Sequence, residues 1–294
     1  AVATLVTNAN LKGFFDGKIY KGNTKVACVP GLNCYSCPGA IGSCPIGSLQ
    51  AVIGSKKFSI SYYVIGIIIL IGALFGRLVC GLLCPFGFVQ DLLYKIPTPK
   101  FKIPAKADRV LRYMKYLILL TFVILLPMFL VDAFGNGAPY FCKLICPAGT
   151  LGGALPLLAK NEGLRSTIGF LFFWKLSILI VVAALSIFTY RPFCKYICPL
   201  GAFYSFFNKI GFYKMEFVSD KCVNCGLCER ACKMDISVRA NPNSLECIRC
   251  GACTAACRHG ALTTSYAGFG KKKEEKPVNV KSCNSNCKGC ANVE

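Results

Sequence analysis

Residues 222–232 read CVNCGLCERAC, and residues 247–257 read CIRCGACTAAC. Both stretches carry four cysteines in the spacing C-x2-C-x2-C-x3-C, which is a ligand spacing for [4Fe–4S] clusters. In tandem motifs of this kind, three close cysteines bind one cluster and the fourth binds the other. Zinc sites and disulfide knots are alternatives, but neither requires a duplicated spacing of this form. We therefore expect two clusters, one held by Cys222, Cys225, Cys228 and Cys257 and the other by Cys247, Cys250, Cys253 and Cys232.

The same stretch resembles the bacterial-type two-cluster ferredoxin. Lys233 and Arg258 stand where that family usually has proline after the fourth cysteine. Because the cysteine spacing is intact, we expect the departure to affect the local turn and the reduction potential rather than cluster binding. The resemblance implies a small α+β ferredoxin domain, which we place at residues 213–264.

The composition of the whole chain differs from that of a soluble ferredoxin. Hydrophobic residues make up 54% of the 294 residues, and the mean hydropathy is +0.53. These values indicate a membrane protein. The 21 cysteines imply either a disulfide scaffold or metal clusters, and the repeated motifs described below favour clusters.

The formal net charge of +21 does not by itself indicate a nucleic-acid partner. Thiolate-bound clusters would offset part of this charge, and many Lys and Arg residues flank apolar segments, as membrane topology requires. No basic stripe is interleaved with aromatic residues of the kind that stack on bases. We therefore expect a membrane partner and other redox subunits, flavin- or haem-containing ones among them, and no nucleic acid.

Three apolar segments predict membrane spans, at residues 58–76, 116–131 and 168–190. The loop at residues 95–115 carries seven basic residues against the single acid Asp108, which places it in the cytoplasm, with Lys115 able to snorkel at the start of the second span. Lys175 lies inside the third span, where an ionisable residue is a functional candidate, although it could also snorkel beside an interfacial Trp174. Residues 150–159 are apolar but too short to cross, which predicts a re-entrant segment.

The motif C-P-x-G occurs four times, starting at Cys44, Cys84, Cys146 and Cys198. Proline suits the first position of a helix, and the free N–H groups of a helix N-terminus favour an anionic group. Each copy therefore predicts a cluster ligand at the start of a short helix. The alternative is a buried structural cysteine beside a helix-breaking Pro and Gly. Three copies have a further cysteine four residues earlier, at Cys80, Cys142 and Cys194.

The expected topology divides these cysteines between the two sides of the membrane. The inner set, which we expect to hold one cluster, consists of Cys80, Cys84, Cys194 and Cys198. On the outer side, Cys28 and Cys34 are further candidates, and the cysteine-rich loop at residues 28–44 could also hold a cluster alone. For the outer set we favour Cys37, Cys44, Cys142 and Cys146.

Membrane segments with C-x3-C-P motifs, followed by a two-cluster ferredoxin stretch, resemble the NapH/NosR-type membrane polyferredoxin family over roughly residues 58–262. The fold class expected is an all-α polytopic membrane domain with re-entrant or half helices at residues 1–212, plus the α+β ferredoxin domain. Residues 265–294 read as a basic linker and tail, whose thiols could hold a labile cluster, acquire metal or be disordered: Cys283, Cys287 and Cys290.

The resemblance implies electron transfer at or across the cytoplasmic membrane, often from quinol or ferredoxin to an exported redox partner. The leading hypothesis is an electron-transfer subunit between a cytoplasmic, ferredoxin-like donor and an extracytoplasmic acceptor. A quinol-oxidising subunit and a cluster-containing assembly or redox-sensing protein are the alternatives. No catalytic residue is expected, because the only histidine is His259 in the ferredoxin domain and acidic residues are few.

Overall fold

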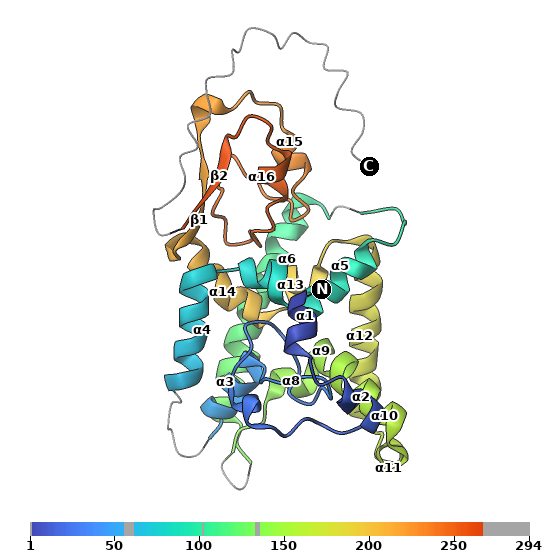
Figure 1. The fold of residues 1–294 in the computed structure, drawn as a ribbon. Coiled ribbons are helices and arrows are strands. Elements are labelled where there is room, and N and C mark those ends of the chain that lie inside the picture. The colour runs from blue at the N-terminus through green and yellow to red at the C-terminus, as the bar shows by residue number, and fades with distance from the viewer. Residues whose placement is uncertain (1, 56–61, 102, 133–135, 267–294) are drawn as a thin grey trace.

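The computed structural model describes residues 2–55, 62–101, 103–132 and 136–266 (Figure 1). It is mainly helical, with one two-stranded sheet formed by β1 (Tyr213–Phe217) and β2 (Leu262–Tyr266). Helices α4 (Tyr62–Phe75) and α12 (Phe170–Phe188) flank the helical part, and the sheet lies beyond one end of it. The molecule is therefore a helical body with a small ferredoxin-like unit at one end.

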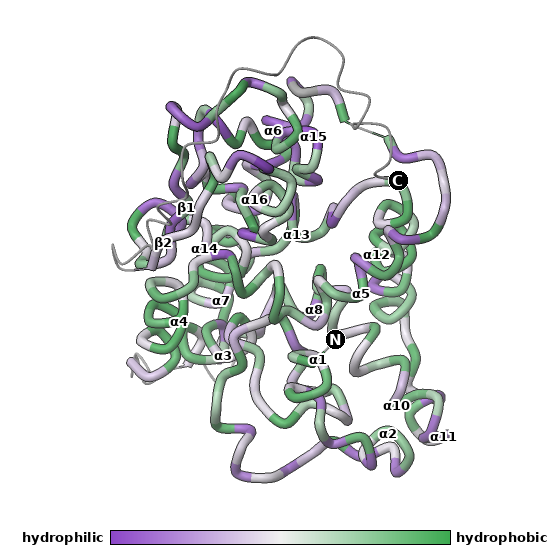
Figure 2. The backbone as a smooth tube through the Cα atoms, turned by 45° about the horizontal axis from the view of Figure 1, so that its top comes forward, coloured by the Kyte–Doolittle hydropathy of each residue, from purple (hydrophilic) through white to green (hydrophobic). Residues whose placement is uncertain are grey.

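Among the residues that the structure describes, two helices are long and apolar enough to cross a membrane. One runs without a break from Lys106 to Phe129 and combines α6 (Ala105–Ile118), the π-helical segment η3 (Leu119–Leu125) and α7 (Leu126–Phe129). The other is α12. Helix α4 is apolar but shorter, and residues 56–61 before it lie outside the described residues. Helices α4 and α12 are hydrophobic along most of their length, whereas α6 carries hydrophilic residues (Figure 2).

The predicted loop at residues 95–115 is wrong in its second half, because α6 begins at Ala105 directly after Pro104. Two of its basic residues, Arg112 and Lys115, contact the ferredoxin unit, whereas Lys106 and Arg109 are exposed. Arg112 Nη2 donates to the carbonyl oxygen of Met234 at 3.0 Å, and Lys115 Nζ lies 2.6 Å from Glu246 Oε1. Lys115 is wholly buried and does not snorkel.

All four C-P-x-G copies start a helix, as the sequence predicts. The cysteine is the residue before the helix and proline is the first residue inside it, because the fixed φ of proline suits that position. The helices that follow the four cysteines are α3 (Pro45–Ile53), α5 (Pro85–Tyr94), α9 (Pro147–Gly149) and α14 (Pro199–Ile210). Helix α9 continues into η4 (Thr150–Ala154) and α10 (Leu155–Lys160), where the re-entrant segment is expected.

The ferredoxin unit is closed by its two strands, which pair antiparallel from Tyr213 opposite Tyr266 to Phe217 opposite Leu262. Between them, two one-turn helices, α15 (Leu227–Arg230) and α16 (Ala252–Ala256), carry the third cysteine of each ferredoxin motif. The remaining short elements are α1 (Val2–Thr7), α2 (Lys12–Asp16), η1 (Asn23–Val26), η2 (Val79–Leu83), α8 (Tyr140–Leu144), α11 (Glu162–Arg165), α13 (Pro192–Tyr196) and η5 (Ser219–Lys221).

Candidate iron–sulfur sites

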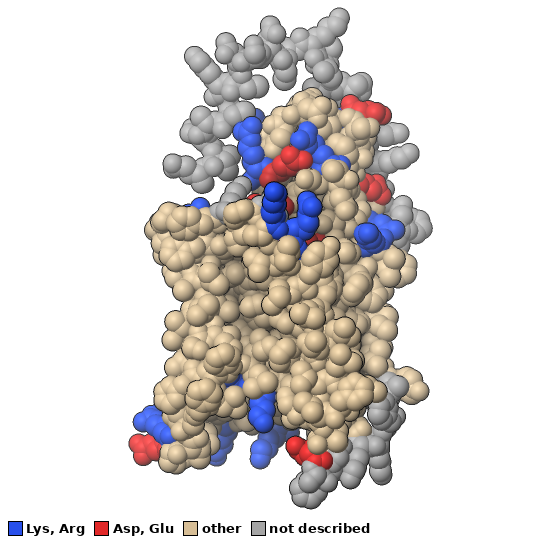
Figure 3. Space-filling model, turned by 180° about the vertical axis from the view of Figure 1, so that it is seen from behind, with Lys and Arg blue, Asp and Glu red and all other residues tan. Residues whose placement is uncertain are grey.

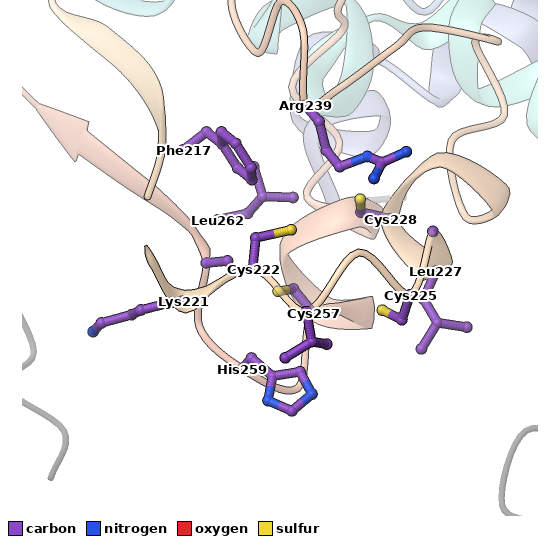
Figure 4. Close-up of a pocket in the computed structure, with 13 residues that line it drawn as sticks. Phe217, Lys221, Cys222, Cys225, Leu227, Cys228, Arg239, Cys257, His259 and Leu262 are labelled. Carbon is purple, nitrogen blue, oxygen red and sulfur yellow. The ribbon is translucent and has the colours of Figure 1, made fainter. Parts of the chain in front are cut away.

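The first ferredoxin set lines a pocket within the ferredoxin unit (Figure 4). Lys221, Arg239 and His259 also line this pocket, and Cys225 is exposed. The fourth cysteine of the second motif thus lies with the first three of the first motif, as expected for a crossed arrangement. The four thiols are those of Cys222, Cys225, Cys228 and Cys257.

The second ferredoxin set lines a separate pocket, which also touches Tyr190 from the helical body. Burial raises the pKa of the Cys253 thiol to about 11, and the neighbouring Cys247 and Cys232 add to the effect. Such a thiol is protonated at neutral pH until a metal replaces the proton. The four thiols are those of Cys232, Cys247, Cys250 and Cys253.

The inner set lies in the core of the helical body. Cys80 comes from η2 and Cys194 from α13, while Cys84 and Cys198 precede α5 and α14. All four are buried, and the backbone N–H of Gly201 donates to Cys198 Sγ at 3.4 Å. Burial raises the pKa of Cys198 well above its ordinary value, and the nearby Cys194 and Cys80 raise it further. The structure therefore brings together the four inner thiols that the topology predicts.

Two buried arginines brace the inner set. Arg77 is 0% exposed, and its guanidinium donates to the Cys194 carbonyl oxygen at 3.2 Å and to Glu246 Oε2 at 3.1 Å. Arg191 donates to the carbonyl oxygens of Cys80 and of Gly81, and it pairs with Asp91. Both cations thus lie beside cysteine-bearing backbone in the protein interior.

We did not predict these two arginines from the sequence, although a repeated spacing could have revealed them. Residues 77–87 read RLVCGLLCPFG, and residues 191–201 read RPFCKYICPLG. The corresponding stretch of the outer set, residues 139–149, reads PYFCKLICPAG and has proline in place of arginine. An arginine three residues before the first cysteine therefore distinguishes the inner motifs from the outer one.

Three of the four predicted outer thiols line a cavity of about 570 Å³ between α3, α9 and α12. The thiols on the cavity wall, which we call the outer set from here on, come from the loop at residues 28–44 and from the α8–α9 motif, so the loop does not build the cavity alone. Cys37, which we predicted here, is not on the cavity wall: it is buried and donates to Asn8 Oδ1 at 3.6 Å. Cys34 takes that place, and Cys28 is absent from the wall. The four thiols on the wall are Cys34, Cys44, Cys142 and Cys146.

Burial also raises the pKa values of the outer thiols. It raises the pKa of Cys44 to about 12 and that of Cys146 to about 11. Two lysines lie near the thiols of this region. Lys175 of α12 lines the cavity, and its Nζ lies with Cys34 Sγ beside Gly149, at 3.7 and 3.6 Å from where a Cβ atom would stand. Lys25 is buried, with Nζ donating to the Tyr35 carbonyl oxygen at 2.5 Å and lying over the Tyr35 ring.

Among the described residues, no group of three or more His, Cys, Asp or Glu side chains is placed to hold a single metal ion. A cubane takes one thiolate at each of its four irons, so its ligands surround a body wider than one ion. Four separate groups of four thiols, two of them around pockets in the ferredoxin unit, fit that donor set. The tail thiols Cys283, Cys287 and Cys290 lie outside the described residues.

Comparison with known proteins matches two family models to this chain. A model described as a 4Fe-4S binding domain matches residues 62–104, 115–165 and 171–216, and a second model with the same description matches residues 241–263. The three segments of the first model contain the motifs at Cys80/Cys84, Cys142/Cys146 and Cys194/Cys198 in turn. No solved structure matches the chain.

Several known proteins are similar to the chain. An uncharacterized protein of Methanocaldococcus jannaschii is 34% identical over 207 residues, which is 68% of this chain and 77% of that protein. The regulatory protein NosR of Pseudomonas aeruginosa is 28% identical over 55% of this chain and 21% of its own length. The putative electron transport protein YccM of Escherichia coli is 25% identical over 58% of this chain and 45% of its own length.

These matches and the cysteine sets define an iron–sulfur electron-transfer protein that binds [4Fe–4S] clusters. More specifically, the chain belongs to the polyferredoxin family of 4Fe–4S electron-transport proteins that includes NosR and YccM.

Proposed function

We propose that the chain is a multi-pass membrane protein that passes electrons between a cytoplasmic donor and an extracytoplasmic acceptor through four [4Fe–4S] clusters. Each of the four thiol sets described above would hold one cluster. The clusters supply one-electron chemistry when bound. The chain's own residues hold the thiolates, exclude water and set the potentials.

The observation that carries this proposal is the contact between the second ferredoxin set and the inner set. Ile248 lies between Cys247 and Cys250, and Gly81 lies between Cys80 and Cys84. A Cβ atom at Gly81 would lie only 2.5 Å from the Ile248 carbonyl oxygen, so the two backbones touch and glycine is required. Two cluster sites in direct backbone contact leave a short path for electron tunnelling.

A second contact leads from the inner set to the outer set. Gly31 packs against the Cα atom of Cys84, where an added Cβ would lie at 2.8 Å. Three residues further along the same loop, Cys34 lines the outer cavity. Tyr204, which is buried, donates its hydroxyl to the Pro30 carbonyl oxygen at 3.0 Å and supports the loop. One short segment of chain therefore connects the two sets.

The distribution of charge supports a membrane position for the helical body. On the face that Figure 3 shows, Lys, Arg, Asp and Glu gather at the two ends of the molecule, with a broad band of other residues between them. The hydrocarbon core of a bilayer is about 30 Å thick, which is too far for a single tunnelling step. Clusters at the inner and outer sets would divide that distance. The basic residues at positions 95–115 favour a cytoplasmic location for the ferredoxin end.

Iron and acid-labile sulfide, measured per chain on anaerobically purified protein, test this proposal. We expect about sixteen irons, since each of the four thiol sets would hold a four-iron cluster. About eight irons would restrict the clusters to the ferredoxin unit and contradict a path through the membrane. In proteoliposomes, reduced ferredoxin added outside should then reduce an acceptor trapped inside, and reduction of external acceptor alone would contradict transmembrane transfer.

A quinol-oxidising subunit remains the second candidate, because an apolar groove of about 510 Å³ lies beside the outer set. Ile145 in its wall precedes Cys146, and Trp174 precedes Lys175. The described residues of the wall are all apolar or aromatic and include no carboxylate or histidine to accept a proton. Binding of a quinone analogue, with a change in the spectrum of the outer cluster, would favour this candidate.

A further inference from the structure

Two of the four C-P-x-G copies share a feature beyond the motif itself. Residues 44–50 read CPIGSLQ and residues 84–90 read CPFGFVQ, so a glutamine follows six residues after each cysteine. The copies at Cys146 and Cys198 have Gly152 and Tyr204 at that position. The four copies are therefore of two kinds, and the inner and outer sets each contain one copy of each kind.

Gln50 on α3 is 0% exposed and reaches across to the other motif of the outer set. Its Oε1 accepts the backbone N–H of Phe141 at 3.0 Å. Its Nε2 donates to Cys142 Sγ at 3.4 Å and to the Ile46 carbonyl oxygen at 3.2 Å. A buried amide with both ends engaged holds the Phe141–Cys142 segment in one position.

Gln90 on α5 repeats these contacts in the inner set and is 1% exposed. Its Oε1 accepts the backbone N–H of Phe193 at 3.2 Å. Its Nε2 donates to Cys194 Sγ at 3.1 Å and to the Phe86 carbonyl oxygen at 3.4 Å. Every contact of Gln50 therefore has a counterpart at Gln90, from an equivalent helix to an equivalent cysteine.

The backbone N–H fixes which end of each amide faces the sulfur. Only the carbonyl oxygen of glutamine can accept the N–H of Phe141 or of Phe193. The amino group must therefore point the other way, toward Cys142 or Cys194, and present an N–H to the sulfur. In iron–sulfur proteins, hydrogen bonds to ligand sulfurs are one of the factors that set the reduction potential.

We propose that Gln50 and Gln90 are matched positioning residues that hold the leading cysteine of each C-x3-C-P motif and tune its cluster. This inference rests on the proposed function, because it requires clusters at the inner and outer sets. An N–H donor stabilises the additional negative charge of the reduced cluster, so it raises the reduction potential. Two equivalent donors would keep the two membrane clusters close in potential, which suits transfer in steps.

The test is a redox titration of the whole protein, followed by electron paramagnetic resonance, with the variants Q50L and Q90L. We expect Q50L to lower the midpoint potential of the outer cluster alone and Q90L to lower that of the inner cluster alone. Loss of one hydrogen bond should shift the oxidised-to-reduced equilibrium roughly tenfold, which is 59 mV for one electron. S186A removes a buried hydroxyl that bonds to Val182 in α12 and should leave every potential unchanged.

Q50E and Q90E keep the size of the side chain and the acceptor for the phenylalanine N–H. They replace the N–H donor with a carboxylate, so the midpoint potential of the same cluster should fall further than in Q50L or Q90L. Loss of only the contacted cluster, with its four irons, would also support the positioning role. Unchanged potentials at full iron content, or equal shifts of both clusters in one variant, would overturn the inference. A wild-type protein with about eight irons would instead overturn the proposed function itself.

Discussion

The inner and outer sets are built from equivalent parts and differ in how they are closed. Both combine a C-P-x-G-x-x-Q helix with an F-C-K-x-I-C-P-x-G segment. The inner set is sealed by Arg77 and Arg191, each of which is buried and paired with a carboxylate. The outer set faces a cavity of about 570 Å³ whose described wall has Lys175 as its cation. Under the proposed function, the enclosed inner set suits relay between clusters, and the outer set, beside its cavity, suits contact with a partner.

The largest effect should come from removing a ligand of the sealed set. C198S should eliminate the inner cluster and about four irons per chain, because the thiolate is lost. The ferredoxin clusters should remain reducible while transfer to an acceptor across the membrane stops. Iron analysis and the proteoliposome assay measure both effects. The matched control is C37S, which changes a buried cysteine off the cavity wall and should keep full iron and full transfer.

The next effect concerns the arginine that seals the inner set against the ferredoxin unit. Removing one partner of a buried ion pair costs about 3–5 kcal/mol, because the other charge is left uncompensated. R77M should decrease the free energy of unfolding. The decrease should lie near the smaller of these values, since Lys115 still pairs with Glu246. Denaturant unfolding of the purified protein measures it. R239M breaks the surface pair with Glu229 and should have a much smaller effect.

The backbone contact between Gly81 in the inner set and Ile248 in the second ferredoxin set offers a kinetic test. G81V would place side-chain atoms against the Ile248 carbonyl oxygen and force the two sites apart. Tunnelling rates fall steeply with distance, so reduction of the inner cluster after reduction of the ferredoxin clusters should slow several-fold. Rapid-freeze spectroscopy measures this step. G66V, at a helical glycine with open space around it, should leave the rate unchanged.

The smallest effect should come from Lys175, the cation that lines the cavity of the outer set. K175M should lower the midpoint potential of the outer cluster, because a nearby positive charge stabilises the reduced state. Since Lys175 is only partly buried, solvent screens its charge and the shift should be smaller than that of Q50L. K143M removes an exposed lysine beside Cys142 and serves as the control. An equal shift in both variants would assign the effect to net charge rather than to the position of Lys175.

Local patterns in the sequence predict much of this molecule. The crossed ferredoxin sets and the helix starts after Cys-Pro follow from spacing and from the geometry of proline, and the grouping of the inner thiols follows from the expected topology. The features that these patterns do not predict depend on contacts between distant segments. Cys34 and Cys37 are three residues apart in one loop, and no local signal says which of them faces the α8–α9 motif. Lys115 appeared to be a snorkelling residue because its partner Glu246 lies 131 positions away.

The seating of the ferredoxin unit has a mechanical consequence. Arg249 donates to the carbonyl oxygens of Phe75 at 3.1 Å and Asn208 at 2.8 Å, and Lys233 lies over the rings of Tyr94 and Tyr190. These contacts clamp the unit to the helical body from two sides. The unit is therefore held against the body, and under the proposed function we expect electrons to pass between the two without a large movement of the unit.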